Sequence, residues 1–365
     1  MTLTNPFSTT YKQARQQLLK AAGDAGLKSE AHVKPHLGIE GEVLALDVVH
    51  MGPPQATQML VLSSGCHGVE GYSGSGVQIA CLQDPLLHQW LQDHEVALLI
   101  LHALNPYGFS YARRVTAQNV DLNRNCIDFN QPLPANPGYA ALHDLLLPAF
   151  WPPNSDNAQA LGQAIQGMGM RQFQDAVTRG QYDHADGIFY GGQAPTWSQL
   201  TFATVLKNIP WHVQRLAWID LHTGLGPRGV GERIFTGGGA DNALGLAQQW
   251  WGDVTSTEDK TAVSSALTGQ LGAVVVQQLG QRLLSSITLE FGTCEPLLVL
   301  HALRADAWAH SARPGAQAWK ARSAQDMKNA FFINEADWKS AVLEQSMAAV
   351  WSAVNGLAQT SINPQ

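Results

Sequence analysis

The segment His67-Gly-Val-Glu70 places an imidazole and a carboxylate three residues apart. It follows an apolar stretch at 59–62 and a Ser-Ser-Gly turn, so both side chains fall just beyond the end of a candidate strand. Imidazole nitrogen and carboxylate oxygen are zinc donors, and a catalytic zinc needs such a mixed set with a position left open. The pair alone is weak evidence, because many helices contain a His and a Glu at this spacing by chance.

A third donor candidate, His222, stands at the end of the apolar segment 216–221 and is followed by a Thr-Gly pair. Taken alone, it is equally typical of a buried histidine that ends a strand. Asp220 lies two residues earlier, on the same side of that strand. There it would either accept the second imidazole proton and orient the ring, or be an unrelated polar residue.

Glu290 lies inside the apolar segment 287–291. A carboxylate in such a segment costs free energy unless it is paired or functional. The functional interpretation is a general base for the water that a zinc ion activates. The alternative is a glutamate on an edge strand that faces solvent.

The segment after the candidate strand 96–101 carries two arginine sites, Arg113-Arg114 and Arg124, with Asn123 beside the second. A guanidinium binds carboxylate through two parallel hydrogen bonds, so this segment is a candidate receptor for an anionic group. A solvated surface loop is the alternative interpretation.

The candidate strands that these motifs follow or end alternate with stretches of helical apolar spacing. The alternation predicts an α/β fold, a three-layer sandwich with a mixed, mainly parallel sheet. Since the carboxyl ends of parallel strands meet at one edge of a sheet, we expect the motifs to converge there. The chain is predicted to form a single domain over 1–365, with an insertion around 131–201 that begins in a Pro- and Asn-rich stretch.

Composition narrows the class of protein further. The formal charge of −7 offers no basic surplus to neutralise phosphates, so no nucleic-acid partner is predicted. Apolar runs are of strand length and the amino-terminal residues lack an apolar signal segment, so we expect no membrane partner and a cytoplasmic location. The four cysteines show no disulfide or CxxC spacing and are predicted to be reduced thiols.

Taken in order, HxxE, then NP…R…DLNRN, then a strand with DLHT, then a strand with Glu, the chain resembles the zinc carboxypeptidase superfamily. It is most similar in appearance to the carboxypeptidase-like bacterial branch, and the DLNR segment is also similar to the aspartoacylase and succinylglutamate desuccinylase group. The resemblance implies one domain around a mixed, mainly parallel eight-stranded sheet and one zinc ion per chain.

The resemblance also implies roles for the residues that match its motifs. The zinc ligands fall on His67, Glu70 and His222. The remaining roles are a general base at Glu290, a carbonyl-polarising arginine at Arg114 (with Arg113 second in preference), and a carboxylate-binding pair at Asn123 and Arg124.

One feature departs from the pattern of these carboxypeptidases. They usually carry a tyrosine between the third ligand and the base, whereas residues 223–289 contain none. Tyr190, in a Gly-rich part of the insertion, is the candidate replacement for substrate binding. The departure puts ordinary carboxy-terminal digestion of proteins in doubt and leaves the metal chemistry as it is.

These patterns predict a zinc-dependent hydrolase, metallocarboxypeptidase-like, that cleaves an amide bond next to a free carboxylate in a small peptide. An N-acyl amino acid deacylase acting on an acyl-amino-acid substrate is the alternative within the same class. A metal-binding protein without catalysis is the alternative from another class, and the sequence leaves the oligomeric state open.

Overall fold

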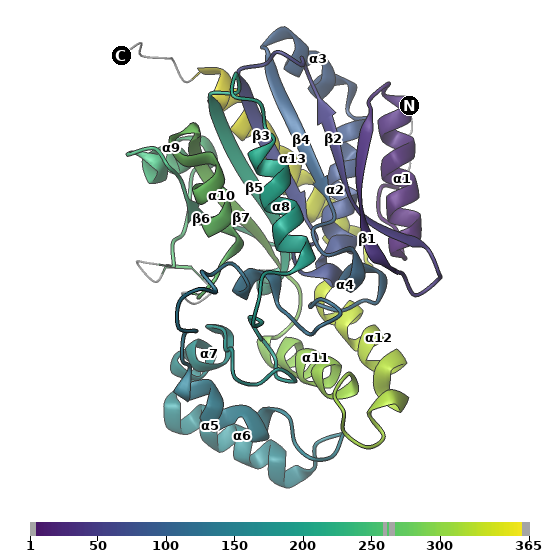
Figure 1. Cartoon of the computed structure of the whole chain (residues 1–365), viewed down its shortest axis with the longest axis vertical. Helices are drawn as coiled ribbons and strands as arrows, with labels where there is room; N and C mark the ends of the chain where they lie inside the picture. Colours follow the sequence, from purple (N-terminus) through teal and green to yellow (C-terminus); the bar gives the residue numbers. More distant parts are fainter. Residues whose placement is uncertain (1–4, 258–260, 263–266, 360–365) are drawn as a thin grey trace.

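The computed structural model describes residues 5–257, 261–262 and 267–359, and within them seven strands form one sheet (Figure 1). The order across the sheet is β1-β2-β4-β3-β5-β7-β6. The strands are β1 (Ser29–Leu37), β2 (Val43–Met51), β3 (Gln58–Ser64), β4 (Val96–His102), β5 (Arg215–Arg228), β6 (Gly231–Gly237) and β7 (Leu283–Gly292).

The centre of the sheet is parallel and its edges are antiparallel. β4, β3, β5 and β7 run parallel to one another, whereas β1, β2 and β6 join through antiparallel pairings. The predicted mixed α/β sheet is therefore confirmed, but with seven strands in the described chain and not eight. Beyond β6, a single bridge between Ile234 and Thr255 occupies the position of an eighth strand, and one bridge is too short to form one.

Both faces of the sheet are covered by helices, as the apolar strands required. Along β3, Leu60 and Leu62 enter one hydrophobic core while Met59 and Val61 enter the other. Packed on the first core are α1 (Tyr11–Asp24), α2 (Gly71–Gln83), α3 (Pro85–Asp93), α9 (Ala243–Trp251) and α13 (Ala336–Gln359). The second core is covered by α8 (Trp197–Lys207) and α10 (Leu271–Leu279). The result is the predicted three-layer sandwich.

A further group of helices lies at one end of the sheet, in the lower half of Figure 1. It comprises α5 (Pro137–Leu146), α6 (Ser155–Met168), α7 (Met170–Thr178), α11 (Pro296–Ala309) and α12 (Lys320–Phe331). Three of these five come from the segment 131–201. Arg304 links α11 to the helices of this segment. Its guanidinium donates to the carbonyl of Leu146 in α5 at 2.7 Å and to Asn157 Oδ1 in α6 at 2.8 Å.

In the described chain, five short helical turns lie in the connections between the longer elements, and two of them carry site residues. These turns are η1 (Gly68–Glu70), α4 (Pro106–Ser110), η2 (Leu122–Arg124), η3 (Gly280–Arg282) and η4 (Ala316–Trp319). η1 follows β3, and both α4 and η2 follow β4. The loops that leave the parallel strands thus meet the extra helices at the carboxyl edge of the sheet.

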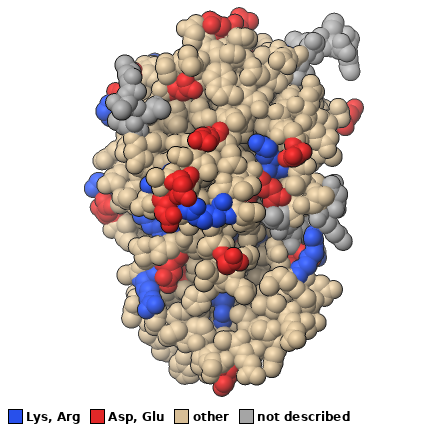
Figure 2. Space-filling model, turned by 180° about the vertical axis from the view of Figure 1, so that it is seen from behind, with Lys and Arg blue, Asp and Glu red and all other residues tan. Residues whose placement is uncertain are grey.

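The face of the molecule seen in Figure 2 carries charges of both signs. Lys and Arg are interspersed there with Asp and Glu, and no basic patch gathers on it. In the described part of the chain, no helix combines the length and the apolar character needed to cross a bilayer. All four cysteines are free thiols, as expected, and three of them are buried.

Candidate metal centre

His67 and Glu70 stand at the carboxyl end of β3, where the chain turns sharply into η1. Gly65 has φ +66°, and a Cβ there would lie 2.8 Å from that of Ala103. Gly68 packs directly on the backbone of Gly108, which a side chain would displace. This tight turn brings His67 Nδ1 to 2.8 Å from Glu70 Oε1, with both side chains buried.

His222 reaches the same point from β5. Because β3 and β5 are paired neighbours, with Ser64 opposite Leu221, the next residue of β5 lies beside the turn after β3. His222 Nδ1 lies 3.2 Å from His67 Nδ1 and 2.9 Å from Glu70 Oε2. Donor atoms of all three residues fall within 4.8 Å of one another. The structure therefore brings the three predicted ligands together.

The hydrogen bonds and the raised pKa of His222 indicate that this cluster favours a cation. Asp220 Oδ2 lies 2.7 Å from His222 Nε2 and accepts a hydrogen bond from it, and Ser63 Oγ donates to the other Asp220 oxygen. Nδ1 of the neutral ring would then direct a lone pair at the Glu70 carboxylate, which is repulsive unless a cation lies between them. Although burial alone would lower the pKa of His222, Asp220 and Glu70 raise it well above its ordinary value.

A zinc ion between His222 Nδ1 and the Glu70 carboxylate would remove this repulsion, as a second proton on the imidazole does. Two imidazole nitrogens and a carboxylate, on three buried side chains that converge, match the donor set of a catalytic zinc site. Burial would raise the pKa of Glu70, but the two imidazoles hold it below the ordinary value, so the carboxylate is ionised for binding. The residues present thus fit the ion, and Asp220 takes the orienting position, one of the two alternatives raised by its spacing.

Asp121 is a site residue to which the sequence analysis assigned no role. Its carboxylate lies 3.2 Å from His67 Nε2 and accepts from Arg114 Nε at 2.9 Å. Burial would raise the pKa of Asp121, yet Arg114 and His67 hold it well below its ordinary value. It therefore supports His67 as Asp220 supports His222. The sequence feature that could have identified Asp121 as a site residue is its place in the DLNRN motif, directly before η2.

Arg114 lies against the cluster. Nη1 donates to Glu70 Oε1 at 3.1 Å, and Nη2 lies 2.7 Å from His67 Nε2. Together with the Asp121 contact, these hold the guanidinium at the edge of the candidate metal position, where it also lines the pocket. A developing negative charge on a substrate oxygen at that position would lie beside a fixed cation.

Glu290 lines the same pocket from β7, where it stands directly opposite His222 of β5. Its Oε1 accepts a hydrogen bond from the backbone N–H of Leu225 at 3.0 Å. Burial, and secondarily the Glu70 carboxylate, raises the pKa of Glu290 to about 7. A carboxyl with that pKa exchanges a proton readily near neutral pH, as a general base requires.

Asn123 and Arg124 form another part of the pocket lining. Arg124 is buried, with Nε and Nη2 donating to the carbonyl of Thr178 at 2.9 and 2.6 Å and Nη1 donating to the Asn123 carbonyl. Asn123 Oδ1 accepts from the N–H of Leu271. A guanidinium has five N–H groups, so Arg124 retains donors for an anion after these contacts.

Two predicted substrate-binding residues lie elsewhere. Arg113 is buried with Nε 3.0 Å from Asp306 Oδ2, so its charge is neutralised inside the fold. Tyr190 is also buried, and its carbonyl accepts a hydrogen bond from the Asp121 N–H. The described pocket lining includes neither, and it includes no tyrosine at all.

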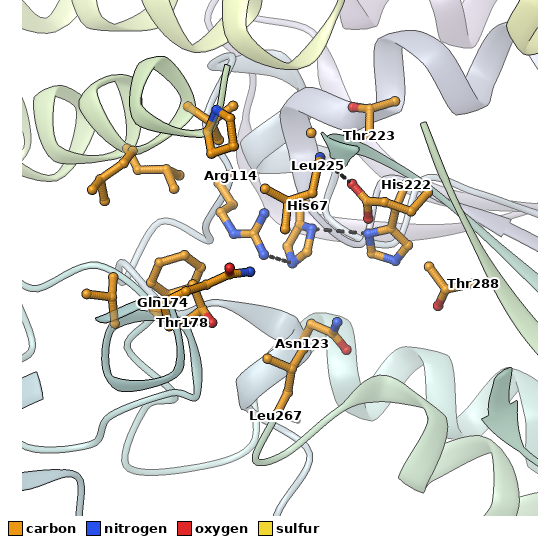
Figure 3. A pocket seen from close by; sticks show the side chains of 18 of the residues that line it. His67, Arg114, Asn123, Gln174, Thr178, His222, Thr223, Leu225, Leu267 and Thr288 are labelled. Carbon is orange, nitrogen blue, oxygen red and sulfur yellow. Dashed lines mark hydrogen bonds between the residues drawn. The ribbon is translucent and has the colours of Figure 1, made fainter. Parts of the chain in front are cut away.

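The pocket above the metal position is mainly apolar. Figure 3 shows Gln174 and Arg114 on one side and His222 and Thr288 on the other. The apolar lining consists of Met170, Phe173, Val177, Phe189, Leu225, Ile234, Phe235, Leu267, Pro296, Leu297, Val299, Leu300, Leu303 and Phe331. Sequence reasoning missed the contribution of α7, because its helical spacing gave no sign of what it faces.

Solved structures confirm the fold that the motifs implied. Bovine thrombin-activatable fibrinolysis inhibitor, in complex with tick carboxypeptidase inhibitor, is 10% identical, with a TM-score of 0.51 over 96% of this chain and 97% of that chain. A second structure of thrombin-activatable fibrinolysis inhibitor is 11% identical, with a TM-score of 0.52 over 96% and 75%. The chain therefore has a metallocarboxypeptidase-like α/β fold.

A metallo-carboxypeptidase from Pseudomonas aeruginosa in complex with (2-guanidinoethylmercapto)succinic acid also matches, at 15% identity and a TM-score of 0.35, over 91% of this chain and 69% of that chain. No curated protein matches the chain. The family described as "Protein of unknown function (DUF2817)" matches residues 7–345, and the chain belongs to that family.

Proposed function

We propose that this protein is a zinc-dependent hydrolase that cleaves an amide bond next to a free carboxylate. The observation that carries the proposal is the convergence of His67, Glu70 and His222 beside Glu290, at the base of an open pocket. Three ligands and a neighbouring buried carboxyl, whose pKa is raised in the metal-free protein, are the parts that metal-assisted hydrolysis needs.

Each polar group has a part in this reaction. Bound zinc would act as a Lewis acid toward the scissile carbonyl and the attacking water. Glu290 takes a proton from the attacking water and returns it to the leaving nitrogen. Arg114 stabilises the negative charge that develops on the carbonyl oxygen, while Asn123 and Arg124 hold the substrate carboxylate. The described lining of the pocket offers no tyrosine to protonate the leaving group, so Glu290 serves both steps.

The test is hydrolysis by zinc-loaded protein of short peptides with free and with amidated carboxyl termini. Cleavage that requires the free carboxylate, and that falls by at least about 100-fold in Glu290→Gln while zinc content stays at one per chain, supports the proposal. Near wild-type turnover in Glu290→Gln would show that another group is the base. Absence of hydrolysis with a full zinc load would overturn the function.

A second candidate, an N-acyl amino acid deacylase, uses the same groups. The apolar lining of the pocket suits an acyl-amino-acid substrate as well as a peptide. An acyl chain and an apolar amino-acid side chain bury the same kind of surface. Cleavage of acyl-amino acids in preference to dipeptides of equal size would select the deacylase.

A further inference from the structure

Helix α7, which belongs to the segment 131–201, presents one continuous stripe to the pocket. Its lining residues Met170, Phe173, Gln174, Val177 and Thr178 follow the i, i+3, i+4, i+7, i+8 pattern of one helix face. Phe173 and Val177 of this face are buried, whereas Arg171 and Gln172 on the opposite side are exposed. The helix therefore forms a wall of the pocket.

The charged side chains that line the described part of the pocket lie near the metal centre. Among the described residues that line it, Glu290 is the sole acid, and Arg114 and Arg124 are the arginines. Away from these groups the described walls on α7, α11 and β6 are mainly apolar, with Gln174, Thr178 and Thr236 as polar members. A substrate group that extends from the centre along α7 meets apolar surface with one amide, that of Gln174, in its midst (Figure 3).

The wall is fixed in position relative to the candidate carboxylate-binding arginine. The carbonyl of Thr178, the last residue of α7, accepts two hydrogen bonds from Arg124. The guanidinium groups of Arg124 and Arg114 lie 5.2 and 5.3 Å from the ring centre of Phe189, which also lines the pocket. A substrate carboxylate held by Arg124 would therefore lie next to the carboxyl-terminal end of α7, within reach of the pocket face of this helix.

We propose that α7 is the specificity-determining wall of the site. It selects substrates that carry an apolar group on the residue with the free carboxylate, and Gln174 is the residue that sets this choice. The inference rests on the proposed function, since it assumes that the centre binds a substrate with a carboxylate beside the scissile bond.

Calorimetry of three dicarboxylic acids binding to zinc-loaded protein tests this preference for an apolar group. The measurement does not require turnover. Succinic acid presents only the two carboxylates, benzylsuccinic acid adds an apolar ring, and (2-guanidinoethylmercapto)succinic acid adds a cation. Burial of the ring against apolar walls is expected to tighten binding by at least about tenfold over succinic acid. The cationic compound is expected to gain nothing over succinic acid.

Two matched variants test whether the pocket face of α7 determines the preference for an apolar group. Gln174→Glu adds a carboxylate in the middle of the pocket face and should reverse the preference, with about a tenfold gain for the cationic compound and a loss for the apolar one. Gln172→Glu makes the same change on the exposed face and should behave as wild type. Met170→Glu, at the half-exposed first position of the helix, is the second variant if Gln174→Glu does not fold.

Affinities are compared with that for succinic acid in the same variant, so a change in the metal centre itself cancels. Equal binding of the apolar and cationic compounds to the wild type, or equal behaviour of Gln174→Glu and Gln172→Glu, would overturn the role of α7. Failure of all three acids to bind zinc-loaded wild type would instead overturn the proposed function, and the role of α7 with it.

Discussion

The Nδ1 atoms of His67 and His222 lie 3.2 Å apart although the residues are separated by 155 positions in the chain. The pairing of β3 with β5 produces this approach, since each histidine follows the paired part of its strand. Asp121 and Asp220 occupy the opposite nitrogens of the two rings. Both rings are thereby oriented with Nδ1 toward a common point, as preorganised ligands require.

The first prediction concerns the ligands. His67→Ala and His222→Ala each remove one of three donors, so zinc affinity should fall by more than about 100-fold, beyond the effect of losing an orienting partner. Metal analysis after dialysis against a competing chelator measures the loss. His94→Ala, at an exposed histidine bonded to its own helix, should retain zinc. A His222→Ala protein that keeps a full zinc load would move the metal site elsewhere.

The second prediction concerns the orienting carboxylates. Asp121→Asn and Asp220→Asn keep the shape of each side chain but weaken its hold on the ring, so zinc affinity should drop about 10- to 100-fold. Asp121→Asn should also lower turnover more than Asp220→Asn does, because Asp121 holds Arg114 as well. Competition with a chromophoric chelator gives both affinities. Unchanged affinity in both variants would mean that the rings are positioned by packing alone.

Much of the central sheet could be predicted from the sequence, because β3, β4, β5 and β7 are buried on both faces and read as apolar runs. The motifs at their ends fixed which side chains would meet. β1 escaped prediction because it is an edge strand with one buried residue in nine. β6 escaped too, since its short sequence carries glycine at both ends and only two buried positions.

The roles of individual arginines could not be read from spacing. Arg113 and Arg114 are adjacent, so their side chains point in different directions, and the sequence does not say which one faces the site. Asp306, 193 positions away, decides the matter by pairing with Arg113. For the same reason the contribution of α7 was invisible, because its partners in the pocket come from distant segments.

The third prediction separates binding from chemistry at Arg124. Arg124→Ala should raise KM about 10- to 100-fold, the worth of a charged hydrogen bond to a substrate carboxylate, with kcat changed only a few-fold. Steady-state kinetics on the preferred substrate provide the measurement. An equal KM for substrates with free and amidated carboxyl groups in the wild type would contradict the assignment of Arg124.

The fourth prediction uses the neighbouring arginine as a contrast. Arg113→Ala leaves the buried carboxylate of Asp306 with His310 as its remaining ionic partner, and should lower the free energy of unfolding by about 3 kcal/mol. KM should stay at the wild-type value, because Arg113 does not line the pocket. Denaturant titration and kinetics on the same sample distinguish the two effects. A raised KM with an unchanged free energy of unfolding would mean that Arg113 binds the substrate and is not a structural residue.

The fifth prediction follows from the raised pKa of Glu290 in the metal-free protein. Since that pKa rises from 4.5 to about 7 on folding, the neutral carboxyl stabilises the fold fully below pH 4.5, and this contribution is lost as pH rises to 7. Glu290→Gln stays neutral, so its unfolding free energy should exceed that of wild type by up to about 3 kcal/mol above pH 7, with the excess vanishing toward pH 4.5. Denaturant titrations of the metal-free proteins between pH 4.5 and 8 measure the difference, with Glu344→Gln at an exposed site as the control. A difference that does not depend on pH would mean that Glu290 is ionised throughout, and that burial does not supply its basicity.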